Sequence, residues 1–150
     1  MDGDALLQGY DSLCSLALKL ALNVLSTASQ AMAGKVFVNR MINLTPTNNK
    51  LFFRCISLIQ RFGGVSAEAA RASLILAIWK SPAEAEKHKD AAISEHIRAC
   101  GQLKGGVTQE QRVLPMAILL ASGLSVQAAE KVLRANPIIR DVISEKMTSN

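Results

Sequence analysis

The residues best suited to metal or acid–base chemistry lie close together in the sequence. His96 and Cys100 are four positions apart, and His88 precedes His96 by about two helical turns. Imidazole and thiolate groups with this spacing share one face of a helix, and both are ligands that Zn²⁺ accepts. No second pair of ligands is recognisable elsewhere, so the sequence predicts no metal site, a solvated His96 and a Cys100 that lies in an apolar seam.

Signatures of catalysis and of nucleotide binding are missing from the sequence. Glu84 and Glu86 fall on different faces of an expected helix, which suits charges that oppose the helix dipole better than an acid–base pair. The glycine pairs at 63–64 and 105–106 lack the spacing and the lysine-serine ending of a phosphate-binding loop. We therefore expect no catalytic residue, no cofactor and no small-molecule substrate, and we expect that the protein is not an enzyme.

The charge and the cysteines limit the class of protein. The net charge of +5 comes from 17 basic and 12 acidic residues, and the bases are scattered, so charge alone is a weak indication of nucleic acid or anionic lipid. Cys14, Cys55 and Cys100 are odd in number and follow no secretory signal, which favours free thiols in a reducing compartment. No stretch has 18 uninterrupted apolar residues, so we expect a soluble, cytoplasmic protein without a membrane span.

The element that must organise the fold is a long helix over about 5–33, which ends at Gly34. Two heptad series give it a wide apolar face: Leu6, Tyr10, Leu13, Ala17, Leu20, Val24 and Leu7, Cys14, Leu18, Ala21, Leu25, Ala28, Met32. Its length of about 42 Å exceeds the roughly 38 Å diameter of a compact domain of this size. We expect it to be the spine of the domain or to lie partly against a partner.

The rest of the chain predicts one all-α domain, a bundle of six to eight helices. We expect a short helix over 35–43, helical hairpins over about 50–80 and 108–135, a charged surface helix over about 82–103, and a last helix after Pro137. Ser81 with Glu84, and Thr108 with Gln111, have the spacing of capping boxes. Pro115 should kink the helix that contains it or delay its regular part.

The most specific signal is an internal repeat. The segments 64–71 and 123–130 share the order glycine, aliphatic residue, serine, any residue, Glu or Gln, two alanines and a charged residue. A left-handed glycine ends one helix, the serine caps the next, and the paired alanines let the two helices approach closely. The repeat therefore predicts the same helical corner twice.

The second copy resembles the DNA-binding helix-turn-helix, with Gly123 as the turn glycine and Ser125 as the cap. This resemblance implies that Gln127, Lys131 and Arg134 are exposed on a recognition helix and contact base edges or phosphates. The alternative is a closely packed helical corner that has no role in recognition.

Two hypotheses for function follow. The first is a non-enzymatic, self-associating adaptor or assembly protein, whose partner is a second copy or another helical protein. Its contacts would come from one face of the long helix: Leu6, Leu13, Leu20 and Val24. The second is a small basic regulator or nucleoprotein-like subunit that binds nucleic acid through the second corner.

Overall fold

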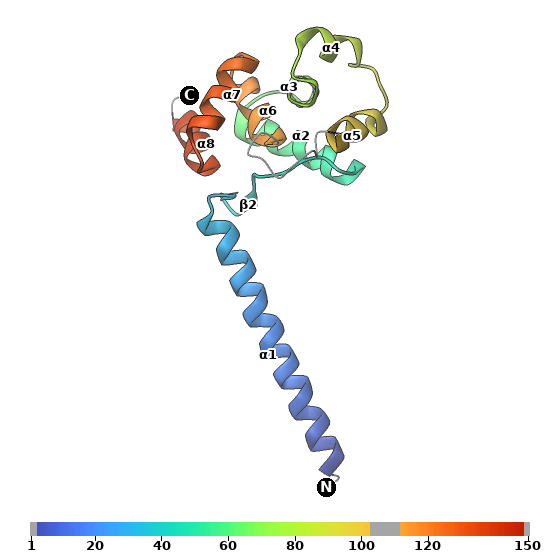
Figure 1. Ribbon diagram of the computed structural model, residues 1–150, viewed down its shortest axis with the longest axis vertical. Coiled ribbons are helices and arrows are strands. Elements are labelled where there is room, and N and C mark those ends of the chain that lie inside the picture. Colours follow the sequence, from blue (N-terminus) through green and yellow to red (C-terminus); the bar gives the residue numbers. More distant parts are fainter. Residues whose placement is uncertain (1–2, 103–111, 149–150) are drawn as a thin grey trace. The chain divides into compact units, whose positions relative to one another are not determined.

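The computed structural model describes residues 3–102 and 112–148 (Figure 1). The order of elements is α1 (Gly3–Met32), β1 (Val36–Phe37), β2 (Arg40–Met41), α2 (Asn49–Gly63), α3 (Ala67–Trp79), α4 (Pro82–Lys87), α5 (Ile93–Gln102), α6 (Val113–Ala121), α7 (Val126–Ala135) and α8 (Ile139–Thr148). The all-α prediction is confirmed. The chain divides into two compact units, residues 1–34 and 35–150, where we had expected a single domain.

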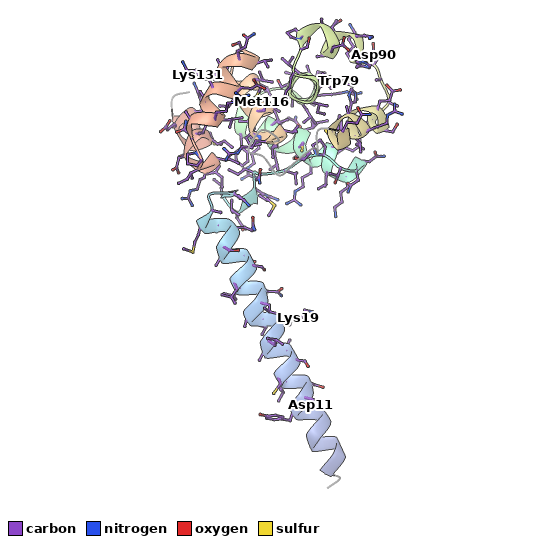
Figure 2. The ribbon with its side chains drawn as sticks, in the orientation of Figure 1. Asp11, Lys19, Trp79, Asp90, Met116 and Lys131 are labelled. Carbon is purple, nitrogen blue, oxygen red and sulfur yellow. The ribbon has the colours of Figure 1, made fainter. Side chains whose placement is uncertain are left out.

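The long helix is present as α1, and it forms the first unit by itself. Asp11 and Lys19 project from it (Figure 2), but most of its side chains are apolar and exposed. The hydrophobic core is drawn from residues 42–143, so α1 is not the spine of that core. The physical reason is that the later helices already bury one another.

By length and average hydropathy, Gly9–Met32 could cross a membrane, which differs from our expectation. Core helices of soluble proteins and signal sequences near an N-terminus satisfy the same criterion.

The expected short helix over 35–43 is wrong, because this segment forms a two-stranded antiparallel hairpin. Val36 pairs with Met41, and Phe37 pairs with Arg40. The turn residues Val38 and Asn39 have φ values of 44° and 56°. Two successive left-handed residues suit a tight hairpin turn, and the β-branched Val36 favours an extended chain in β1.

The centre of the second unit is α6. Its residues from Val113 to Leu120 are all buried, and α2, α3, α7 and α8 pack around it. Pro115 lies in the first turn of α6, where its missing N–H removes no bond within the helix. The helix is therefore regular from Val113 onward.

The repeated corners form as predicted, between α2 and α3 and between α6 and α7. Gly64 and Gly123 both have positive φ, at 63° and 87°. Ser66 Oγ accepts the N–H of Ala69, and Ser125 Oγ accepts the N–H of Ala128, each at 3.2 Å. The second alanine of each copy, Ala70 and Ala129, is fully buried between the paired helices.

The charged helix expected over 82–103 is divided into α4 and α5. The chain turns over 88–92, and the Ser81 side chain makes no capping hydrogen bond. A tertiary contact, the stacking of the His88 ring on Trp79, fixes the end of α4. The other expected capping box, Thr108 with Gln111, lies outside the described residues.

Arg112 connects the start of α6 to the end of α7. Its guanidinium donates to the carbonyl oxygens of Leu133 at 3.2 Å, Asn136 at 2.9 Å and Pro137 at 3.0 Å. These carbonyls lie at a helix C-terminus, where backbone acceptors lack partners within the helix and cations are favoured.

We expect Arg112→Ala to lower the free energy of unfolding by about 2 kcal/mol, since three hydrogen bonds to a charged group are lost, and the one to Leu133 is partly buried. Urea unfolding followed by circular dichroism measures this loss. Arg112→Lys should recover only part of it, because a lysine cannot span three carbonyls in the same way. Equal stability of Arg112→Ala and wild type would contradict this role.

The three thiols should differ in reactivity. Cys14 is exposed on α1, whereas Cys55 and Cys100 are buried. Burial raises the pKa of Cys55 to about 12 and that of Cys100 to about 11. Because the thiolate is the reactive form, iodoacetamide should modify Cys14 in the folded chain and reach the other two only in denaturant. Intact-mass spectrometry counts the labels, and fast labelling of Cys55 in the folded chain would contradict the burial.

Candidate functional site

The residues predicted for partner contact lie on the exposed α1. Leu13, Leu20 and Val24 are 67%, 55% and 66% exposed. The side chain of Leu6 lies outside the described residues. The structure thus leaves this apolar face uncovered within the first unit.

The residues predicted for nucleic-acid contact lie together on α7. Gln127, Lys131 and Arg134 line one shallow hollow along this helix, and Lys131 is labelled there in Figure 2. Glu130, in the same hollow, forms an ion pair of 3.2 Å with Lys80 at the end of α3. The face is therefore mixed in charge, which suits contact with a polyanion poorly.

No group of three or more ligating side chains occurs among the described residues. The absence of a metal site from the whole chain stays a prediction. The prediction that His96 is solvated is wrong, because His96 is fully buried in α5. Its ring stacks on Phe52 of α2, with centroids 5.8 Å apart. Cys100 lies in the apolar core, as predicted.

A surface that the sequence analysis missed lies on α2, and we name it the α2 cationic face. Its members recur at helical spacing and are all exposed: Lys50, Phe53, Arg54, Ser57 and Arg61. The opposite side of α2 is buried: Phe52, Cys55, Leu58, Ile59 and Phe62. The sharp division of α2 into two sides fixes the cationic face outward.

The α2 cationic face is positive without compensation from its own helix. Among the described helices, α2 alone combines basic residues with no Asp or Glu. Lys50 lies in the first turn, where the helix dipole is also positive. Within the described residues, no ion pair joins Lys50, Arg54 or Arg61 to an acid. Such a surface attracts anions.

The α2 cationic face includes an exposed aromatic ring. Phe53 is 56% exposed, while its neighbour Phe52 is fully buried. The exposed ring lies one helical turn from Lys50 on the helix surface. Aromatic residues and arginine are both enriched in protein–protein interfaces relative to the rest of the surface. The sequence signal that marks this face is three bases over 49–63, no acid, and a phenylalanine outside the apolar stripe.

Comparison with known proteins identifies relatives of the second unit. Residues 38–143 match the family described as the C-terminal lid domain of glucokinase regulatory protein. This match falls within the compact unit 35–150 and includes α2 through the start of α8. No solved structure matches the chain.

Individual relatives have two kinds of name. The chain is 30% identical to human glucokinase regulatory protein over 129 residues, which is 85% of this chain and 20% of that protein. It is 46% identical to N-acetylmuramic acid 6-phosphate etherase from Escherichia coli over 59 residues, or 39% of this chain and 20% of the enzyme. The corresponding etherase from Parasynechococcus marenigrum is 39% identical over 69 residues, or 45% of this chain and 22% of the enzyme. The chain thus spans about a fifth of the curated relatives it matches.

These findings correct both functional hypotheses. The relatives are a regulatory protein and an enzyme of a sugar phosphate, so the self-associating assembly protein and the nucleic-acid-binding regulator are both wrong. The second corner, with Gln127, Lys131 and Arg134, belongs to the family that matches residues 38–143, and not to a DNA-binding helix-turn-helix family. Because the match covers most of the chain, this protein belongs to the family of the C-terminal lid domain of glucokinase regulatory protein.

Proposed function

We propose that this chain acts as the lid of a sugar-phosphate-binding protein, and that the α2 cationic face is the side directed at the phosphorylated sugar. The observation that carries the proposal is this exposed, acid-free basic face within the lid unit. The etherase relatives are named for a sugar 6-phosphate, which is an anion at neutral pH. A positive lid surface complements such a ligand.

The chemistry of the face suits a phosphorylated sugar. Arg54 and Arg61 offer planar, forked donors that match phosphate oxygens, and Lys50 adds a compact charge near the start of α2. Phe53 offers an apolar ring beside these charges, so one face can contact both the phosphate and the sugar ring of the ligand. The described residues offer no comparable set on another helix.

The lid supplies binding and closure in this proposal, and no reacting group. The Cys55 and Cys100 thiols are buried with raised pKa values, and His96 is inaccessible to a ligand. One relative is named as an enzyme and another as a regulatory protein, so similarity to this chain occurs in proteins of both kinds. Our prediction that this chain is not itself an enzyme is consistent with such a role.

The α1 helix fits this proposal as an attachment to a larger protein. The 129 aligned residues of the human relative exceed the length of the unit 35–150, so the relationship reaches into α1. That relative is more than four times as long as this chain, because the 129 aligned residues are 20% of its length. We infer that the exposed apolar face of α1, with Leu13, Leu20 and Val24, packs against the kind of domain that forms the rest of the relatives.

Charge reversal on α2 tests the sugar-phosphate role. We expect N-acetylmuramic acid 6-phosphate to bind the chain with a Kd on the order of 1 mM and to shift amide resonances of α2 in ¹⁵N–¹H spectra. Lys50→Glu should weaken binding by at least about fivefold, because an attractive charge becomes repulsive. Lys131→Glu is the matched control, since it changes the net charge equally on α7, and it should weaken binding by less than about twofold.

The same titration with unphosphorylated N-acetylmuramic acid should give no shifts on α2. If the two charge reversals weakened binding equally, or if the phosphate made no difference, the α2 cationic face would not be the sugar-phosphate surface.

The two neighbouring phenylalanines offer a second test, because Phe52 is buried and Phe53 is exposed. Phe52→Ala should lower the free energy of unfolding by about 3–5 kcal/mol, whereas Phe53→Ala should change it by less than about 0.5 kcal/mol. In the titration above, Phe53→Ala should weaken binding of the sugar phosphate. Unchanged affinity of this folded variant would remove Phe53 from the proposed surface.

A further inference from the structure

The single tryptophan and both histidines of the chain meet in one cluster. Trp79 ends α3, His88 follows α4, and His96 lies in α5; Trp79 is labelled in Figure 2. The His88 ring stacks on the indole at a centroid distance of 3.9 Å and an angle of 3°. Trp79 Nε1 donates a hydrogen bond of 3.1 Å to His96 Nδ1. Two imidazoles from different segments thus hold one indole.

The hydrogen bond from Trp79 fixes the protonation state of His96. Because Nδ1 accepts, the proton of the neutral ring is on Nε2. His96 Nε2 is buried and has no hydrogen-bond partner in the part of the chain that the structure describes. The ring is held in place by Phe52, whose plane lies 16° from that of the imidazole. His96 is therefore a buried imidazole whose Nδ1 accepts a hydrogen bond from Trp79 and whose Nε2 has no hydrogen-bond partner among the described residues.

A second proton on His96 is incompatible with this arrangement. The imidazolium ring carries N–H groups on both nitrogens, so its Nδ1–H would point at the N–H of Trp79. The hydrogen bond would then become a contact between two donors at a part-buried site, where the His96 side chain has no access to solvent. Protonation and the Trp79 contact are mutually exclusive.

The groups around His96 favour its neutral form. Burial lowers its pKa below the ordinary value of 6.5, and electrostatic interactions with Arg71 on α3 and with His88 lower it further. Glu95 on α5 acts in the opposite direction, and α2 presents only the uncharged ring of Phe52.

The sign of the pH effect follows from this shift. An unfolded chain takes up the proton at a higher pH than the folded one. The stability that neutral His96 contributes is therefore complete above pH 6.5 and is lost as the pH falls through the lower folded pKa.

We propose that Trp79, His88 and His96 form a proton-sensitive latch between α3 and α5. With His96 neutral, the latch holds the start of α5 and the turn over 88–92 against the end of α3. Proton uptake by His96 breaks the Trp79 contact and opens the surface hollow that Trp79, His88 and Glu95 help to line. The segment is suited to such release, because α4 has no buried residue and its ion pairs, among the described residues, join side chains of 84–89 to one another.

The single indole makes the latch directly observable. We would record the indole N–H resonance and the tryptophan fluorescence from about pH 8 to about pH 5. We expect one transition with a midpoint below pH 6.5, coincident with the titration of His96 carbon-bound protons. Helix content measured by circular dichroism should stay constant through this transition. A flat indole signal, or helix loss at the same midpoint, would overturn the proposal.

Three variants separate the latch from general acid sensitivity. His96→Asn keeps an acceptor oxygen near the position of Nδ1 but cannot take up a proton, so its indole transition should disappear. His88→Asn and Arg71→Gln each remove a positive charge near His96, so both should move the wild-type midpoint to higher pH. If His96→Asn does not fold, the other two variants decide, and an unchanged midpoint in both of them would overturn the latch.

Discussion

The burial of α6 is the constraint on which the unit 35–150 depends. All of its residues from Val113 to Leu120 are buried, so no side of this helix can face water. Its neighbours α2, α3, α7 and α8 must therefore cover it completely. The left-handed Gly64 and Gly123 reverse the chain at the two corners and set the directions of these neighbours. Where α2 ends, a Cβ on Gly63 would lie 3.0 Å from the Cβ of Ala121, so this approach depends on small residues.

Features with a local cause could be predicted from the sequence, and features with a tertiary cause could not. The caps at Ser66 and Ser125 follow from neighbouring residues and form as predicted. The hairpin over 36–41 was missed because its turn places Val38 in a left-handed conformation that valine rarely adopts. The break between α4 and α5 was missed because it depends on a tertiary contact. His88 and His96, on either side of the break, both contact Trp79 of α3.

The candidate site shows the same limit. In the sequence the basic residues are scattered, and nothing there distinguishes those that form ion pairs from those that do not. In the structure Lys80 pairs with Glu130, while Lys50 and Arg54 have no acidic partner among the described residues. The second corner has the local geometry of a helix-turn-helix, but this geometry is a general way to pack two helices and does not determine function. Its family relationship, not its shape, excluded recognition of DNA. The charge pattern of α2 was readable in the sequence only once the buried side of the helix was separated from the exposed side.

Helix α2 connects the buried histidine to the proposed ligand surface. Phe52 on its inner side stacks on His96, and the adjacent Phe53 lies on the outer side, one helical turn from Lys50. A displacement of α5 removes part of the packing that holds the inner side of α2, and a helix responds to lost packing as a rigid element. The cationic side chains must then move with the same helix. The proposed latch at His96 thus contacts the inner side of the same helix whose outer side carries the α2 cationic face.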